Sequence, residues 1–392
     1  MNNKYGIPVV WKTVLAVAAI SITTPVLAGY VEPDGFDELK TITFVNQPGS
    51  DSQRFQETID SLPGKKGIIR IRSSDEEYLM GGIVVPSNVH IRMEPGVRIR
   101  KDMSVRGANV FSLTGENVSI AGASPSEKAV IAVDGDPNHP DQHSFRAVGA
   151  KEVTNFRIAN LFIEEKDTRF STIMTQNTAR DGTIENISMT GAGPGWGLLQ
   201  MQGGVNIIAR NLDGQGGFTL RLEQGSATAP IGIQNLQAEN IIGRHGRSAV
   251  LIAPKSTVNG KAVIKDITSY GCQWAVLASS GKGDGKFENV LIKGKITAHY
   301  DDHGSQFRTF ERKMNNVQFL PESLQKKVGV MPGYGRNKFS TGASSGAVKV
   351  APVEWIVIDD KATIERKGFP FDDPDIVTDA YMKKMISENG VR

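Results

Sequence analysis

The sequence predicts an all-β fold, a right-handed parallel β-helix with a helical cap at its N-terminal end. Four segments begin with glycine and run into a short apolar strand, and a second recurring strand lies between them, as in Val205–Ile208. The four segments start at Gly195, Gly217, Gly246 and Gly271, spaced 22, 29 and 25 residues apart. Such a repeat is typical of a solenoid, whose turns bury their apolar faces by stacking on their neighbours.

Residues 1–28 have the pattern of a secretory signal peptide. Lys4 and Lys12 precede an apolar run from Val14 to Ile22, and Ala28 ends a small-residue cleavage pattern. The run is short for a membrane span, so a retained N-terminal anchor is the weaker alternative. We therefore expect the mature protein to be secreted or periplasmic.

The charge balance gives no reason to expect a nucleic-acid or membrane partner. Residues 1–28 hold two lysines and no carboxylate, so 45 basic residues minus 2 leave 43 against 42 acidic ones, a net charge of +1. Cys272 is the only cysteine, which excludes an intramolecular disulfide. We expect a monomer stabilised by a large core, because a continuous solenoid can exceed the usual domain size.

Residues 29–392 read as one β-helix domain with three parts. Residues 29–102 form the N-terminal cap, in which Ser50–Ser52 begins a short helix that carries Phe55, Ile59 and Leu62 at helical spacing. Such a helix would cover the exposed edge of the first turn. Strands are expected at residues 66–72, 82–85, 88–93 and 97–100.

Regular coils occupy residues 103–297, and loops with a second cap occupy residues 298–392. Asn155, Asn186 and Asn235 fall at similar places in successive coils, as expected of asparagines stacked at bends with left-handed backbone. A loop at 134–143 carries His139, Asp141 and His143, but a proline-broken polar loop is weak support for a metal site. A strand pair at 354–358 and 362–365 and a helix at 374–388 are expected near the C-terminus.

Alternation along the repeated strands brings polar side chains together. If Leu220 and Leu222 point inward, Arg221 and Glu223 point outward, and one coil earlier Gln200 and Gln202 do the same. This outward cluster is the candidate active site. We expect partial cover to raise the pKa of Glu223 into the range of a proton donor, whereas the structural alternative is a solvated, inert glutamate.

Basic and aromatic side chains surround this cluster in the sequence, and guanidinium groups match sulfate or carboxylate through paired hydrogen bonds. Alternatively, some of them span coils and pair with Glu239 or Asp266. Trp196 and Trp274 either offer flat faces to sugar rings or fill bends. The basic candidates for substrate binding are Arg221, Arg244, His245, Arg247 and Lys255.

Four motifs resemble the iota-carrageenases, inverting β-helical hydrolases that cut sulfated red-algal galactans. They are Trp196-Gly-Leu-Leu-Gln-Met-Gln202, Gly216-Gly-Phe-Thr-Leu-Arg-Leu-Glu223, Ala253-Pro-Lys-Ser-Thr-Val-Asn-Gly260 and Ile267-Thr-Ser-Tyr-Gly-Cys272. The resemblance is strongest from residue 191 to residue 294.

The resemblance implies that Glu223 is the general acid and that Gln200, with Gln202 as the neighbouring option, holds the catalytic water or a chloride. Two positions depart from the family pattern. Gly225 stands where the family has the aspartate of Glu-x-Asp, the usual base, and Lys255 stands where it has a histidine. An inverting glycosidase needs a second carboxylate, and the possible substitutes are Asp213, Glu239, Asp301 and Asp302.

The function that follows is secreted hydrolysis of an anionic, sulfated galactan such as iota-carrageenan. The missing aspartate keeps two alternatives open, a polysaccharide lyase on a uronic-acid polymer with Lys255 as base and a non-catalytic glycan-binding β-helix. No Walker loop, paired CxxC or dinucleotide motif is present, so no organic cofactor or metal is expected. A bound chloride or calcium ion remains open.

Overall fold

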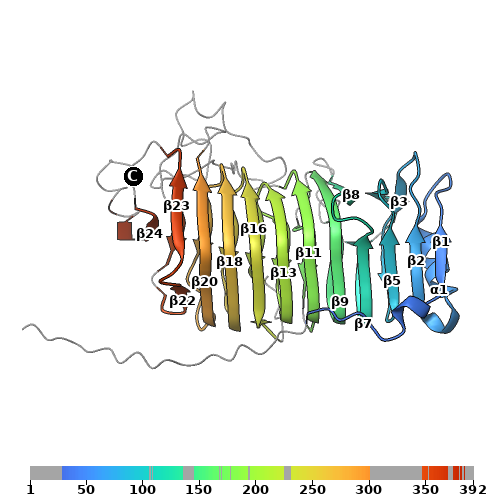
Figure 1. Cartoon of the computed structure of the whole chain (residues 1–392), viewed down its shortest axis with the longest axis horizontal. Coiled ribbons are helices and arrows are strands. Elements are labelled where there is room, and N and C mark those ends of the chain that lie inside the picture. Colours follow the sequence, from blue (N-terminus) through green and yellow to red (C-terminus); the bar gives the residue numbers. More distant parts are fainter. Residues whose placement is uncertain are drawn as a thin grey trace, which may run out of the picture.

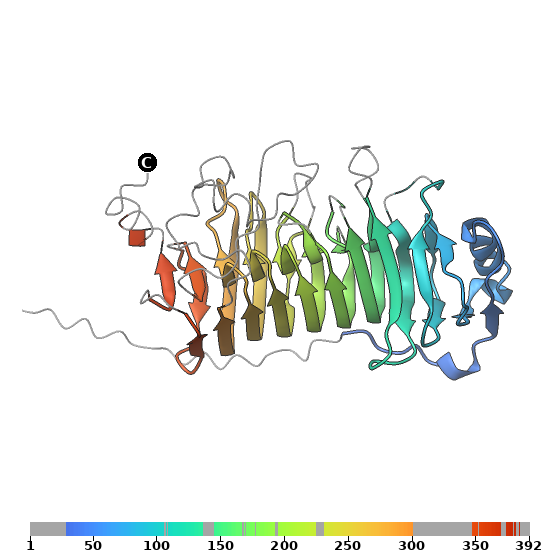
Figure 2. The same ribbon diagram turned by 90° about the horizontal axis from the view of Figure 1, so that it is seen from above.

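The chain forms a parallel β-helix in which strands of successive turns lie side by side (Figure 1). The computed structural model describes residues 29–105, 107, 109–135, 145–166, 168, 170–176, 178–192, 195–224, 231–300, 347–351, 353–369, 374–378, 380–381 and 384. The molecule is elongated, with the α-helix at one end and the last strands at the other (Figure 2). The predicted fold class is confirmed.

The longest row of paired strands, which we call the long ladder, links eleven strands of the described chain. Each strand pairs in parallel with the equivalent strand of the next turn. In order they are β1 (Thr41–Phe44), β2 (Gly67–Ile71), β5 (Val89–Met93), β7 (Asn109–Gly122), β9 (Arg146–Lys166), β11 (Arg180–Thr190), β13 (Gly204–Gln215), β16 (Leu236–Arg244), β18 (Val258–Tyr270), β20 (Lys286–His299) and β23 (Thr363–Lys367).

A second row, the short ladder, runs parallel to the first on another face of the solenoid. It starts at β4 (Ile83–Val85), uses the first residues of β7 and β9, and continues through short strands. These are β10 (Ile173–Thr175), β12 (Gly197–Met201), β14 (Phe218–Leu222), β17 (Ser248–Ile252), β19 (Trp274–Ala278), β21 (Val348–Val350) and β24 (Ile376–Thr378).

The remaining elements complete individual turns. Strand β3 pairs with β6, β6 with β8, and β8 with the end of β9, while β15 pairs with β13 and β22 with β20. Their bounds, with those of the two 3-10 turns, are β3 (Tyr78–Met80), β6 (Arg98–Lys101), β8 (Ala129–Asp134), β15 (Ile233–Gln234), β22 (Ile356–Ile358), η1 (Phe36–Glu38) and η2 (Pro63–Lys65).

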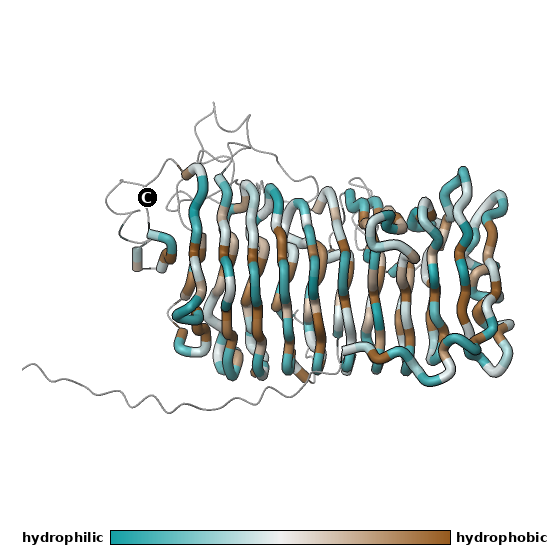
Figure 3. The backbone as a smooth tube through the Cα atoms, viewed as in Figure 1, coloured by the Kyte–Doolittle hydropathy of each residue, from teal (hydrophilic) through white to brown (hydrophobic). Residues whose placement is uncertain are grey.

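One apolar core runs along the axis of the solenoid. Alternate residues of each strand enter it, which gives the banded hydropathy of the strands in Figure 3. In the short ladder, Leu199, Leu220 and Val250 are paired neighbours and all are fully buried. The residues between them on each strand therefore face away from this core.

Stacked asparagines form the bends of the long ladder, and they occupy two bends rather than one. Asn155 and Asn235 share the first bend, whereas Asn186 lies five residues further along its turn, in the second. Each has a φ between 51° and 55°, the left-handed region. Side-chain amides join consecutive turns, as between Asn186 and Asn211 (2.9 Å), so these asparagines are structural as predicted.

The predicted N-terminal cap helix is confirmed as α1 (Ser52–Asp60). Phe55 and Ile59 are buried against the core end, and Leu62 follows them. Asp51 is the N-cap residue, but its side chain accepts a hydrogen bond from the backbone N–H of Leu79 (3.1 Å) instead of capping the helix.

Two expectations outside the coils have different outcomes. The expected helix at 374–388 is wrong in its first turn, because Ile376–Thr378 is strand β24, paired with β21. The signal peptide at 1–28 and the loop with His139, Asp141 and His143 lie outside the described residues. Within the described ranges, no helix has the length and apolar character needed to cross a bilayer.

Candidate active site

Glu223 directly follows β14, on the side of the short ladder that faces away from the core. Leu220 and Leu222 are fully buried within the solenoid, as alternation predicts. Gln200 pairs with Arg221 across β12 and β14, so residues 21 positions apart meet on one surface. The carboxylate of Glu223 lies in that surface but is only 6% exposed.

The carboxylate of Glu223 is held between two cations. Its Oε2 pairs with Nε of Arg221, and its Oε1 lies 2.6 Å from Nζ of Lys255. Burial alone raises the pKa of this carboxyl, but the charges and hydrogen bonds of Arg221 and Lys255 outweigh burial and lower it below its usual value. The expectation of a raised pKa is therefore wrong for the protein without substrate, because both cations reach the same carboxylate.

Gln200 is tied to the same residue. It is 3% exposed, and its Nε2 donates a hydrogen bond to the backbone oxygen of Glu223 (3.0 Å). This bond fixes the amide beside the carboxylate and leaves the amide oxygen as the group for water or another polar ligand. Gln200 thus also orients the end of β14.

Gln202 extends the polar surface toward the N-terminal end of the solenoid. Its Oε1 accepts a hydrogen bond of 2.5 Å from Nε2 of Gln176, one turn earlier. Gln176 was not among the predicted site residues, although Ile173-Met174-Thr175-Gln176 aligns with Leu199-Gln200-Met201-Gln202 and would have revealed it.

The outer face of the short ladder changes from polar at β14 to apolar at β17 and β19. Arg221 of β14 pairs with Leu251, and Leu251 pairs with Leu277 of β19. Leu251 and Leu277 pack with Phe218 and Trp274 in a second apolar cluster, separate from the main core. Trp274 is 1% exposed, so it fills this cluster and offers no face to a sugar.

Arg221 is a fixed side chain. Its Nη1 donates to the backbone oxygen of Gly195 (2.7 Å), and its guanidinium lies 4.9 Å from the ring centre of Trp196. Only 11% of the side chain is exposed, against 45% for Lys255. Arg221 and Trp196 therefore brace Glu223, and Lys255 is the partner that is free to move.

The other basic candidates do not contact Glu223. Arg244 forms two hydrogen bonds with Asp213 (2.8 and 2.9 Å) and stacks on Tyr270. It therefore links turns of the solenoid, as the structural alternative expected. Its partner is Asp213, however, and not Glu239 or Asp266. His245 and Arg247 lie in the turn before β17, and Arg247 stacks on Phe218 (5.2 Å). Arg244, His245 and Arg247 thus precede strand β17 of the short ladder, whereas Lys255 follows it.

The candidates for a second carboxylate are not brought to Glu223 in the described chain. Asp213 is paired with Arg244, and Glu239, on the long ladder, pairs with Lys265 (2.5 Å). Gly225, Asp301 and Asp302 lie outside the described residues. The adjoining Gln224 is fully buried and donates to Asn259 of the next turn, so it serves the fold.

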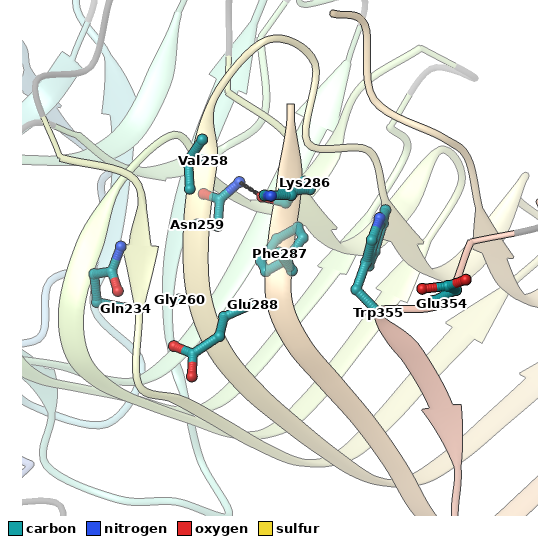
Figure 4. A pocket seen from close by; sticks show the side chains of 9 residues that line it. All are labelled: Gln234, Val258, Asn259, Gly260, Lys286, Phe287, Glu288, Glu354 and Trp355. Atoms are coloured by element: carbon teal, nitrogen blue, oxygen red, sulfur yellow. Dashed lines mark hydrogen bonds between the residues drawn. The ribbon is translucent and has the colours of Figure 1, made fainter. Parts of the chain in front are cut away.

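A separate pocket of about 680 Å³ opens beyond Asn259, at the bend that leads from β15 and β18 to β20 (Figure 4). Phe287 and Trp355 form its apolar wall, with ring centres 5.6 Å apart. Glu288 and Glu354 also line it, which makes it a poor fit for an anionic glycan. Asn259, which accepts a hydrogen bond from Gln224, lines this pocket, whereas Glu223 and Gln200 do not.

Two relatives of known identity resemble this chain in sequence. An iota-carrageenase from Zobellia galactanivorans is 30% identical over 269 residues, 64% of this chain and 52% of the relative. An iota-carrageenase from Alteromonas macleodii is 30% identical over 252 residues, 60% of this chain and 50% of the relative. The chain thus spans about half the length of these relatives. No family model matches it.

Solved structures agree with the fold. An iota-carrageenase from A. fortis superposes with a TM-score of 0.72 at 20% identity, covering 90% of this chain and 92% of that one. An iota-carrageenase complexed with iota-carrageenan fragments superposes with a TM-score of 0.69 at 20% identity, over 90% and 93% of the two chains. The chain is therefore similar to the iota-carrageenases in sequence over 64% of its length and has their β-helical fold.

Proposed function

We propose that this chain is a secreted glycoside hydrolase that cleaves an internal bond of a sulfated galactan such as iota-carrageenan. One observation carries the proposal. Glu223, the residue that the family resemblance assigns as general acid, is a buried carboxylate on an outward surface, beside Gln200 and two cations. The 30% identity to two iota-carrageenases supports the substrate class.

In this proposal, the substrate itself prepares the acid. A sulfate group draws Lys255 away from Glu223, because Lys255 is the more exposed partner and Arg221 stays anchored. Glu223 then keeps one cation and loses more solvent, and both changes raise its pKa. A protonated Glu223 donates its proton to the glycosidic oxygen as the bond to the anomeric carbon breaks.

Water completes the reaction by adding to the anomeric carbon, with Gln200 holding it in place. The proton of this water must pass to a base on the opposite face of the sugar in an inverting reaction. Asp213 and Glu239 are engaged in ion pairs elsewhere. Asp301 and Asp302, which follow β20 in the sequence, stay the candidates for this base.

The test is Glu223→Gln, matched with Glu185→Gln. Glu185 is also 6% exposed and also pairs with two cations, Arg157 and Arg210, but on the long ladder. We expect Glu223→Gln to lower kcat by about 10²- to 10⁴-fold. Glu185→Gln should leave kcat unchanged, because its carboxylate braces turns far from the proposed bond. Carrageenans, agars, alginate and pectins form the substrate panel, with new reducing ends as the readout.

Two observations favour a second candidate, a non-catalytic glycan-binding β-helix: the pKa of Glu223 is lowered, and Gly225 stands where the family has its usual base. Binding of a sulfated galactan without new reducing ends would establish that function instead. A lyase is less well supported, because Arg244 is engaged by Asp213 and both sequence relatives are iota-carrageenases. Ultraviolet absorbance of an unsaturated product would reveal one. Activity that survives Glu223→Gln would remove the acid assignment.

A further inference from the structure

Arg146 is a buried arginine on the same ladder as Glu223. It is the first residue of β9, and the short ladder runs from β9 through β10 and β12 to β14. Adjacent strands lie about 4.8 Å apart, so three steps place the β9 position about 14 Å from the β14 position along the axis. The residue is 8% exposed. No sequence pattern singled it out.

One nitrogen of the buried Arg146 guanidinium lacks a hydrogen-bond partner in the described chain. Its Nε is buried and makes no hydrogen bond, and no carboxylate of the described chain pairs with it. Arg157, Arg221 and Arg244, by contrast, each pair with a carboxylate. Burial lowers the pKa of Arg146 to about 10, which leaves it charged at neutral pH. A buried, unpaired charge is costly unless another group completes it.

Aromatic side chains connect Arg146 to the surroundings of Glu223. The guanidinium of Arg146 lies 3.7 Å from the ring centre of Phe170. The ring of Phe170 meets Trp196 edge to face at 5.9 Å, and Trp196 lies under Arg221. This row follows the solenoid axis along the edge of the short ladder, and it holds the guanidinium of Arg146 against an aromatic ring. The fork of donors on a guanidinium matches planar and tetrahedral anions.

We propose that Arg146, stacked on Phe170, is an anion subsite that binds a sulfate ester of the galactan chain three strands away from Glu223. The sulfate would supply the acceptors that the guanidinium lacks in the described chain, through charge-assisted hydrogen bonds. The separation means that this sulfate belongs to a different sugar from the one at the cleaved bond. The inference rests on the proposed function, because it takes the anion to be carried by the galactan.

The test compares the Glu223→Gln protein, in which turnover is suppressed, with the same protein carrying Arg146→Met. Methionine retains an apolar contact with Phe170 and removes the charge. Binding of sulfated galactan oligosaccharides of increasing length is measured by calorimetry. We expect the parent to gain affinity when the oligosaccharide is long enough to reach Arg146, and Arg146→Met to lose about ten- to hundredfold at those lengths alone. Equal affinity of the two proteins at every length would overturn the proposal.

Two further variants serve as controls for the binding experiment. Arg70→Met removes an arginine on β2 that pairs with Glu94 (2.7 Å) and should bind all lengths as the parent does. Arg146→Lys keeps the charge without the fork and should retain part of the length-dependent gain. If Arg146→Lys kept the whole length-dependent gain in affinity, bidentate recognition would be contradicted. If Arg70→Met lost that gain, a specific role of Arg146 would be contradicted.

Inorganic sulfate separates this inference from the proposed function. Sulfate should raise the Tm of the wild-type protein, and Arg146→Met should lose that increase. If the wild-type protein bound no galactan but kept this response, the anion site would stand and the proposed function would fall. If galactan bound and Arg146→Met had no effect on either probe, the function would stand and the subsite would fall.

Discussion

Lys255 holds Glu223 in the ionised form, whereas the proposed mechanism needs the protonated form. The residue has a left-handed φ of 51° in the turn after β17, and its amine reaches back to the carboxylate one turn earlier. A general acid must carry a proton, and an amine within hydrogen-bond distance opposes this. In the proposed mechanism, Lys255 thus both opposes protonation of Glu223 and makes the first contact with a sulfate.

Replacing Lys255 by methionine should therefore move the pH profile. Without the amine, burial of Glu223 is opposed by Arg221 alone, so the pKa of the carboxyl rises. Because the protonated form is the active one, the alkaline limb of kcat/KM should shift to higher pH. KM for sulfated substrate should also rise, since one cation is lost. Both are measured on a soluble carrageenan between pH 4 and 9.

Lys265→Met is the control for this experiment. Lys265 pairs with Glu239 and Asp266 on the long ladder, where no substrate contact is proposed. Its profile should superpose on that of the wild-type protein. An alkaline limb in Lys255→Met that stays in place would show that another group donates the proton.

Alternation along strands explains which parts of the site the sequence could reveal. It located Gln200, Arg221 and Glu223 on one outer face because register and side-chain parity follow from the repeat alone. It did not reveal that Lys255 and Arg221 meet the same carboxylate, because the reach of long side chains depends on turn geometry. Arg146 was missed for the related reason that its surroundings come from Phe170, a turn residue outside any strand pattern.

The asparagine bends determine the shape of the long ladder, and Asn211 allows their contribution to be measured. It has a φ of 55°, donates to Asn186 and accepts from Asn240, each at 2.9 Å. Alanine would lose both hydrogen bonds and strain the left-handed backbone, whereas glycine would lose only the bonds.

We expect Asn211→Ala to lower the free energy of unfolding by about 3 kcal/mol and Asn211→Gly by about 1 kcal/mol. Urea unfolding followed by circular dichroism measures both. The difference between the variants isolates the cost of the left-handed conformation. Equal losses would mean that the amide ladder alone matters at this bend.

Across the whole molecule, the segment before β1 runs along the solenoid and joins several turns, as Figure 1 shows. Tyr30 donates its N–H to Thr183 of β11 (2.9 Å), and Val31 donates to Asn155 of β9 (2.8 Å). Phe36 packs edge to face on His90 of β5 at 4.7 Å. This segment, which we call the strap, makes contacts between residues that are 54 to 153 positions apart in sequence, which is why local patterns did not predict it.

The contact at His90 makes the strap, and with it the solenoid, sensitive to pH. His90 is 1% exposed and its Nδ1 lies 2.9 Å from Oγ of Ser119. Burial, aided by the nearby charge of Arg92, lowers the pKa of His90 from 6.5 to about 4. Below pH 6.5 the unfolded chain binds a proton that the folded chain does not, so stability falls as the pH is lowered until about 4.

We expect His90 to reduce the free energy of unfolding by about 3 kcal/mol between pH 6.5 and 4. His90→Gln should remove this part of the slope while costing some stability at pH 7, because glutamine does not titrate. Denaturant unfolding at closely spaced pH values gives both curves, and the carboxylates with lowered pKa values, such as Glu185 and Glu223, contribute equally to each and cancel in the difference. Parallel curves for the two proteins would mean that His90 takes up its proton alike in the folded and unfolded chains, and that the strap does not sense pH through it.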